Sequence, residues 1–221
     1  MSIFDKWAWI KRNWQYVIEE ATALGLVFVG GTALNLAIYD EYRASEDIDL
    51  YDTRTKGAGT AHEKECLEKL SGRLSGKGFE IKSLSERAAW VGPNIKIEIF
   101  NDGTLFGKVL KRRVGQAEVL TFDARTYAKM KMAALLCRSV YDARDLVDLF
   151  VIEKRDGIDA PFPMHECATI ENHFDERLRD IKGTKKADLL VFQSPGQIDG
   201  LPYDEFVKFR VSMHERLSQF R

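Results

Sequence analysis

A short apolar strand that runs directly into two glycines limits the folds open to this chain. Residues 26–29 are Leu-Val-Phe-Val, which is typical of a buried strand, and Gly30-Gly31-Thr32 follow at once. Residues 33–39 are then predicted to be helical. Glycines after a strand let backbone amides approach a phosphate closely, and the N-terminus of the following helix and the Thr32 hydroxyl can add to such a site. The segment is therefore a candidate phosphate cradle, with an ordinary tight turn as the alternative.

Two aspartates on the next predicted strand are candidate metal ligands. Residues 47–51, Asp-Ile-Asp-Leu-Tyr, alternate acidic and apolar side chains, so Asp47 and Asp49 project from one face of a strand. Hard oxygen ligands of this kind suit Mg²⁺ or Mn²⁺. A third acid, Glu98, is on the alternating strand predicted at residues 95–99, which could lie beside the first strand. Three acids at one sheet edge favour a metal site over the alternative, a solvated acidic surface.

The first half of the chain is predicted to mix helices and strands. Residues 4–24 place tryptophan and aliphatic side chains at three- and four-residue spacing, which predicts an amphipathic helix, and residues 62–74 are predicted to form an exposed helix. Further strands are predicted to begin near residue 79 and to occupy residues 95–99 and 118–122, with a hairpin turn at residues 101–103. This order predicts an α+β fold with a mixed sheet flanked by helices.

The pattern changes after Asp123, where helical spacing dominates. Helices are predicted at residues 126–137, 142–152 and 203–220. The predicted organisation is therefore a core at residues 1–122 followed by a helical C-terminal region at residues 123–221.

Charge and composition exclude some classes of partner. The formal net charge is -1, so the chain has no global basic field that would hold a long nucleic acid without a local patch. One basic cluster could bind the phosphates of an acceptor, although the simpler interpretation is the solvated end of a hairpin. The cluster comprises Lys108, Lys111, Arg112 and Arg113.

No membrane partner and a cytoplasmic location are expected. No apolar run approaches the roughly 18 residues of a membrane span. The cysteines are odd in number and lack metal-ligand spacing, so free thiols are predicted for Cys66, Cys137 and Cys167. The histidines are scattered, and surface or structural roles are predicted for His62, His165, His173 and His214.

Two blocks of residues resemble a known family. The first is Gly30-Gly31-Thr32-Ala33-Leu34 with Arg43-x-Ser45-x-Asp47-Ile48-Asp49-Leu50, and the second is Lys131-x-x-Ala134-Leu135-x-x-Arg138 with Arg144-Asp145-Leu146-x-x-Asp148-Leu149. Together they resemble the AbiEii/AbiGii toxin family of the DNA polymerase beta-like nucleotidyltransferase superfamily. The likeness spans residues 29–150. The superfamily's usual Gly-Ser is here Gly31-Thr32, which keeps a hydroxyl, and Glu98 stands where aspartate is commoner.

The resemblance implies a nucleotidyltransferase-type core and assigns a role to each matched residue. Gly30, Gly31 and Thr32 would hold the triphosphate, with Ser45 and Arg138 also binding nucleotide, and Asp47, Asp49 and Glu98 would bind the metal. Lys131 would contact phosphate, with Lys129 as its competitor for that role. Asp145 and Asp148, three apart on one helical face, would belong to the site that the helical region completes.

The implied reaction moves a nucleotide from a nucleoside triphosphate (NTP) to an acceptor hydroxyl, with pyrophosphate leaving. The resemblance further implies that the acceptor is RNA, particularly a tRNA 3′ end, and that the enzyme is a toxin paired with an antitoxin protein. Two alternatives remain open at this point. Transfer to a hydroxyl of a protein or of a small molecule such as an aminoglycoside would use the same chemistry, and a catalytically inactive nucleotide-binding module would keep the site without turnover.

Overall fold

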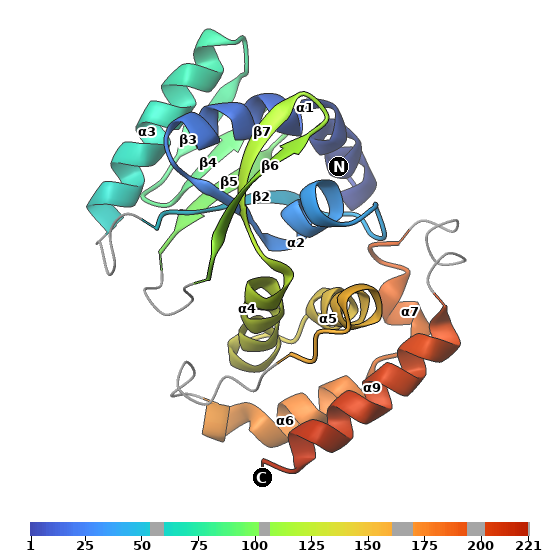
Figure 1. The fold of residues 1–221 in the computed structure, drawn as a ribbon. Helices are drawn as coiled ribbons and strands as arrows, with labels where there is room; N and C mark the ends of the chain where they lie inside the picture. The colour runs from blue at the N-terminus through green and yellow to red at the C-terminus, as the bar shows by residue number, and fades with distance from the viewer. Residues whose placement is uncertain (54–59, 102–106, 161–169, 194–201, 221) are drawn as a thin grey trace. The chain divides into compact units, whose positions relative to one another are not determined.

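A computed structural model describes residues 1–53, 60–101, 107–160, 170–193 and 202–220. The chain divides into two compact units, Met1–Asp123 and Ala124–Arg221. Each is described by itself below, with the elements labelled as in Figure 1.

The first unit contains a five-stranded mixed sheet in the order β1-β2-β5-β4-β3. β2 and β5 run parallel, whereas the other neighbours are antiparallel. The predicted α+β class with a mixed sheet is therefore confirmed. The strands are β1 (Val27–Val29), β2 (Asp47–Tyr51), β3 (Ile81–Leu84), β4 (Ala88–Val91) and β5 (Ile95–Phe100).

Two helices, α1 (Ile3–Ala23) and α3 (Thr60–Gly76), lie side by side against this sheet (Figure 1). α1 begins with a capping box, in which the Ser2 hydroxyl accepts from the Asp5 amide and the Asp5 carboxylate accepts from the Ser2 amide. Its buried face carries the residues predicted from their spacing, and Trp14 stacks on Phe28 of β1 with ring centroids 5.9 Å apart. Because the aliphatic residues of β2 and β5 alternate, one sheet face is buried and the other is left for polar residues.

A separate two-stranded sheet completes this unit, and it corrects part of the sequence-based topology. β6 (Val109–Val114) pairs antiparallel with β7 (Ala117–Phe122) around a turn at Gly115, whose φ is 60°. The exposed basic side chains of β6 obscure the alternation of polar and apolar residues that marks a strand, so β6 was not predicted. β4 was also not predicted. The predicted turn at residues 101–103 falls largely outside the described residues, but a hairpin there is wrong because β5 pairs with β2 and β4.

The helix after the glycines begins earlier than predicted and changes its winding. α2 (Gly30–Ala33) continues into a π-helix, η1 (Leu34–Ile38). Such π-helical turns are rare and occur often at functional sites. Asn35 in this turn donates to the Gly31 carbonyl at 2.8 Å and accepts from the amides of Tyr42 and Arg43. It therefore ties the loop before β2 to the glycine turn.

The second unit is helical in its described residues, as the sequence predicts. α5 (Ala143–Asp156) is capped by the Asp142 carboxylate at its start and by Gly157, with φ 64°, at its end. Phe150 of α5 packs against Phe206 and Phe209 of α9. The other helices are α4 (Ala124–Cys137), α6 (Ile170–Gly183), α7 (Lys186–Leu189) and α9 (Tyr203–Ser218).

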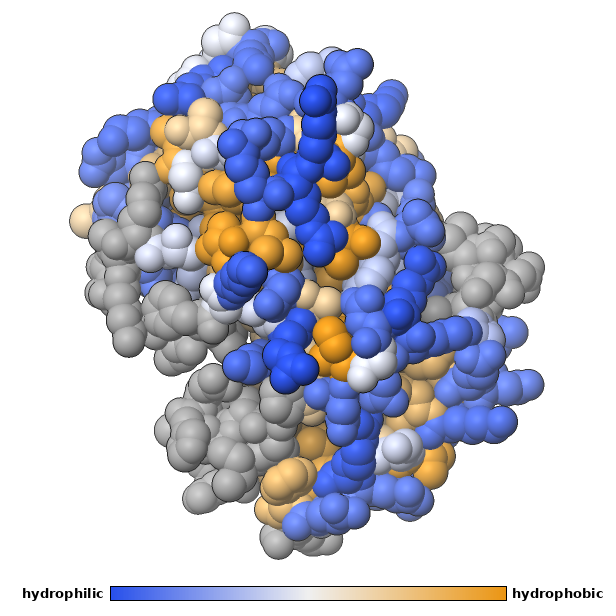
Figure 2. All heavy atoms as spheres, in the orientation of Figure 1, coloured by the Kyte–Doolittle hydropathy of each residue, from blue (hydrophilic) through white to orange (hydrophobic). Residues whose placement is uncertain are grey.

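The surface and the cysteines complete the description. Hydrophilic residues cover most of the molecular face drawn in Figure 2, and among the described residues no helix combines the length and apolarity that crossing a bilayer requires. Cys66 is buried and outside any disulfide, as predicted. Cys137 is disulfide-bonded, so the free thiol predicted there is wrong, and the prediction for Cys167 falls outside the described residues. Pairing depends on the distance between thiols in the fold, which spacing along the chain does not report.

Candidate active site

Gly30 brings the first turn into contact with the acidic strand. Its φ is +76°, and a Cβ atom added there would lie 2.0 Å from Asp49 Oδ2. Both the left-handed backbone and the lack of space therefore require glycine at this position. The consequence is that the Asp49 carboxylate lies directly against the backbone of the turn.

Gly31 is required for a different reason. A Cβ atom at Gly31 would lie 2.1 Å from Arg43 Nη2, so the absent side chain makes room for a guanidinium group. Arg43 is buried, and its Nη1 donates to the Ala44 carbonyl at 2.9 Å. The first block of the sequence therefore includes a buried cation directly behind the glycine turn.

The parallel pairing of β2 and β5 brings the three predicted acids onto one face of the sheet. Asp47 is in register with Lys96, and Asp49 is in register with Glu98. The strand carrying Glu98 thus neighbours β2 rather than β1, the first strand, which pairs on the other side of β2. Neighbouring strands lie about 4.8 Å apart, so the three carboxylates share one part of the sheet face, although their oxygen atoms do not all come within 4.8 Å of one another.

Thr32 is turned into the protein rather than toward this face. Its hydroxyl donates to the Asp47 carbonyl at 2.5 Å, and the residue is fully buried. Ser45 is also buried, in the loop that leads to β2. In this structure the Thr32 hydroxyl therefore positions the start of the acidic strand, and its predicted contact with phosphate remains a prediction, as does that of Ser45.

Lys96 is a member of the cluster that sequence reasoning missed. Its Nζ lies 2.5 Å from Glu98 Oε2. Burial alone would lower the pKa of Lys96, but the hydrogen bond to Glu98 and the negative field of Glu98, Asp47 and Asp49 outweigh it and raise the pKa above its ordinary value. The ammonium therefore stays charged at neutral pH and offsets part of the acidic charge. The alternation of side chains along this strand was enough to predict that Lys96 lies on the same face as Glu98.

The second block forms a buried ionic cluster within the second unit. Lys131 Nζ lies 2.8 Å from Asp145 Oδ1 and 2.7 Å from Asp148 Oδ2. The three side chains are only 8%, 1% and 0% exposed, respectively. Arg138 Nη1 lies 3.0 Å from Asp145 Oδ2, as an ion pair rather than a well-aligned hydrogen bond. Lys129 is not in this cluster and is half-buried, so Lys131 is the lysine that meets the two aspartates.

The acidic face passes a chemical test for a hard divalent cation. Its potential ligands are carboxylate oxygens, which Mg²⁺ and Mn²⁺ prefer, and all three side chains are partly exposed and hence reachable. The turn beside them has no side chain at Gly30, where a Cβ would occupy the space next to Asp49. The residues present therefore fit a metal-bound phosphate group.

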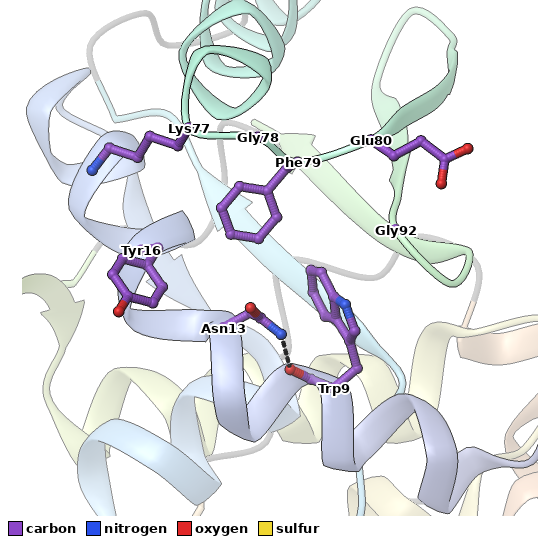
Figure 3. A pocket seen from close by; sticks show the side chains of 8 residues that line it. All are labelled: Trp9, Asn13, Tyr16, Lys77, Gly78, Phe79, Glu80 and Gly92. Atoms are coloured by element: carbon purple, nitrogen blue, oxygen red, sulfur yellow. Dashed lines mark hydrogen bonds between the residues drawn. The ribbon is translucent and has the colours of Figure 1, made fainter.

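A cavity elsewhere in the first unit has a different character. It has a volume of about 630 Å³ and lies between α1 and the turns around Gly78 and Gly92 (Figure 3). Trp9 and Phe79 line it in an edge-to-face pair, with ring centroids 5.9 Å apart. None of the predicted site residues lines this cavity, so it is not the place where the acids would bind a nucleotide.

The fold and its acidic face define the class: this is a nucleotidyltransferase fold. A candidate nucleotidyltransferase from H. pylori has the same fold, with a TM-score of 0.54 and 15% identity over 96% of both chains. A nucleotidyltransferase-like antigenic protein from Paracoccidioides brasiliensis aligns over 84% of this chain and 89% of its own, with 15% identity and a TM-score of 0.47. The antibiotic-resistance factor ANT(2'')-Ia aligns over 75% of this chain and 91% of its own, with 11% identity and a TM-score of 0.43. No curated protein matches the sequence.

The chain belongs to the family described as the nucleotidyl transferase AbiEii toxin of type IV toxin–antitoxin systems. The family profile matches residues 17–218, which include both blocks of candidate site residues. The resemblance stated from the sequence is thereby confirmed.

Gly30→Ala is expected to disturb the candidate site and lower stability. The new Cβ would overlap the Asp49 carboxylate and would hold an alanine in the left-handed region, at a cost of about 1–3 kcal/mol. Chemical denaturation should show that loss, and titration with a labelled nucleotide should show weaker binding. Gly72→Ala is the matched control, because a Cβ there meets nothing within 4 Å and alanine favours the helix. Unchanged stability and nucleotide binding in Gly30→Ala would contradict the assignment.

Proposed function

We propose that this protein transfers a nucleotide from an NTP to an RNA hydroxyl in a metal-dependent reaction, as the toxin of a toxin–antitoxin pair. The observation that carries the proposal is the register of β2 with β5, which places Asp47, Asp49 and Glu98 on one face of the sheet, with Asp49 against the Gly30 turn. Membership of the family supports nucleotide transfer and an antitoxin partner. The metal, the triphosphate donor and the RNA acceptor, with a tRNA 3′ end as the expected site, are parts of the proposal.

In this proposal, the backbone around Gly30 and Gly31 would contact the triphosphate, and the carboxylates of Asp47, Asp49 and Glu98 would hold Mg²⁺ or Mn²⁺. The bound metal would neutralise charge on the triphosphate, orient it and polarise the incoming hydroxyl. Arg43 supports the turn from inside the protein, since its guanidinium fills the space next to Gly31. Lys96 holds Glu98 and offsets acidic charge near the metal ligands.

The proposed reaction forms one bond and breaks one. The acceptor hydroxyl oxygen bonds to the α-phosphorus of the NTP, and the bond between that phosphorus and the bridging oxygen breaks. Pyrophosphate leaves with the electron pair, and the hydroxyl proton is released to water. Such a transfer requires mainly positioning and charge neutralisation from the protein, which a glycine turn beside three acids can supply.

A basic strand supports a phosphate-rich acceptor. Lys111, Arg112 and Arg113 of β6 are exposed and line a cavity of about 580 Å³, with an exposed ion pair between Lys111 and Glu118 at 2.7 Å. Nucleic-acid binding proteins hold the backbone phosphates of RNA and DNA through such side chains. This surface, rather than the net charge of the chain, is the local patch that an RNA acceptor requires.

The acceptor can be identified with labelled nucleotides. We expect that incubation with each α-labelled NTP and Mg²⁺ will place label in an RNA pool, and that EDTA will prevent it. Separate pools of protein and of aminoglycosides should stay unlabelled, and Arg112→Glu with Arg113→Glu should weaken RNA labelling most at low salt, with a difference from wild type that shrinks as salt rises. Label in the protein or aminoglycoside pool would replace RNA as the acceptor. NTP binding without label in any pool would favour the inactive nucleotide-binding module.

A further inference from the structure

Three side chains that could bind a soft metal meet on the other side of the sheet from the acidic face. Asp52 directly follows β2, and its amide donates to the Phe100 carbonyl, which continues the strand register. Alternation therefore directs Asp52 to the same side as Ile48 and Leu50, away from Asp47 and Asp49. His62 and Cys66 come from the first turns of α3 and, being four residues apart, share one face of that helix.

The distances among their ligand atoms are close to those of a tetrahedral zinc site. Asp52 Oδ2 lies 2.8 Å from His62 Nε2, Cys66 Sγ lies 3.6 Å from His62 Nε2, and Cys66 Sγ lies 3.8 Å from Asp52 Oδ2. Zinc bonds of about 2.0–2.3 Å at tetrahedral angles separate such atoms by roughly 3.3–3.6 Å. Two of the three separations therefore need almost no change, and the third must lengthen by about half an ångström.

Burial gives the cluster an inner and an outer side. The Asp52 side chain is fully buried, Cys66 is 4% exposed, and the His62 side chain is 33% exposed. A buried carboxylate and thiol are costly unless they are paired or bind a metal. The exposed histidine provides a route by which an ion can enter from solvent.

The geometry argues against a nucleophilic triad made of the same residues. In a Cys-His-Asp triad the carboxylate contacts one ring nitrogen and the nucleophile contacts the other. Here one atom, His62 Nε2, faces both Asp52 and Cys66. A single nitrogen cannot take a proton from the thiol while it is held by the carboxylate, whereas a metal ion would bind all three groups.

We propose that Asp52, His62 and Cys66 bind one Zn²⁺ ion, with a fourth position open to water. Thiolate and imidazole ligands select zinc over magnesium, whereas the acids on the opposite sheet face offer only oxygen. The ion would link the end of β2 to the start of α3 and so stabilise the first unit. This proposal does not depend on the proposed function.

Cobalt substitution tests the site directly in the full-length protein. After removal of metals, titration with Co²⁺ in thiol-free buffer should give one equivalent of tightly bound ion, with a thiolate-to-cobalt charge-transfer band and the visible bands of a tetrahedral site. Zn²⁺ should displace the cobalt and raise the Tm by several degrees, because it binds only the folded state.

Variants separate this site from the rest of the chain. Cys66→Ser should abolish the charge-transfer band, and His62→Gln or Asp52→Asn should weaken binding by roughly 100-fold or more, since even loss of an outer-shell partner costs 10–100-fold. Asp49→Asn and the exposed His173→Gln are the controls, and both should keep the band. Circular dichroism establishes that each variant is folded.

Two results would overturn the proposal. One is a wild-type protein that binds Co²⁺ without a thiolate band, a measurement that needs no variant to fold. The other is a band that survives in Cys66→Ser or disappears in Asp49→Asn. Either result would leave the three residues as a hydrogen-bonded cluster, in which Asp52 accepts from the histidine and the thiol.

Discussion

Asp47→Asn is expected to lower nucleotide transfer by roughly a thousandfold or more, because the variant loses one of the charges that would hold the metal beside the triphosphate. The fold should survive. Thr32 bonds to the backbone carbonyl of Asp47, not to its side chain, and that bond is kept in the variant. Removal of one acid from a cluster of three also relieves repulsion, so the Tm should stay within a few degrees of wild type or rise.

The measurement is incorporation of label from an α-labelled NTP, made beside a thermal unfolding curve for the same preparation. Asp49→Asn should behave in the same way, since Asp49 contacts the Gly30 turn. Glu65→Gln is the matched control, because Glu65 is an exposed acid of the same unit whose carboxylate pairs with Lys69 on its own helix, α3, at 2.6 Å. Normal labelling by Asp47→Asn would show that the acids are not the metal site.

Lys131→Met is expected to produce the largest loss of stability. The substitution leaves the carboxylates of Asp145 and Asp148 buried without the ammonium between them. Removal of one partner from a buried ionic cluster costs about 3–5 kcal/mol, because the remaining charge stays out of water. In a chain of this length the Tm should fall by roughly 6–20 °C. Lys129→Met, which changes a lysine outside the cluster, should cost much less.

A compensated variant can separate a structural role of this cluster from a role in transfer. Lys131→Met combined with Asp145→Leu and Asp148→Leu replaces all three charges by apolar groups, which is often neutral or stabilising. Stability should then recover while labelling stays lost, as the family resemblance implies for Lys131. If labelling recovers with stability, these residues only support the fold.

Local patterns were enough to locate the strand that carries the acids. Asp47–Tyr51 was predicted with its observed bounds, because alternation of acidic and apolar residues is itself the strand period. The amphipathic spacing of α1 predicted a helix within one residue of each observed end. Gly30-Gly31 marked the turn, although only the coordinates show which groups, Asp49 and Arg43, need the missing side chains.

Pairing between distant strands could not be obtained in this way. The neighbours of β5 are β2 and β4, and no local signal distinguishes them from the hairpin expected at residues 101–103. Alternation places Lys96 on the same strand face as Glu98, but only the register shows that Asp47 lies directly beside it. The cluster of Asp52, His62 and Cys66 was missed because the carboxylate comes from a strand end and the other two groups from a helix.

The amino-acid sequence by itself determined which segments become strands and helices, which residues carry charge, and which family the two blocks resemble. These properties depend on neighbours a few positions away, where backbone period and side-chain chemistry are read directly. Only the tertiary structure decided which strands pair, that Lys131 is buried between two aspartates, and that three potential zinc ligands meet. Those outcomes depend on packing and register between segments far apart in the chain, which no short stretch of sequence encodes by itself.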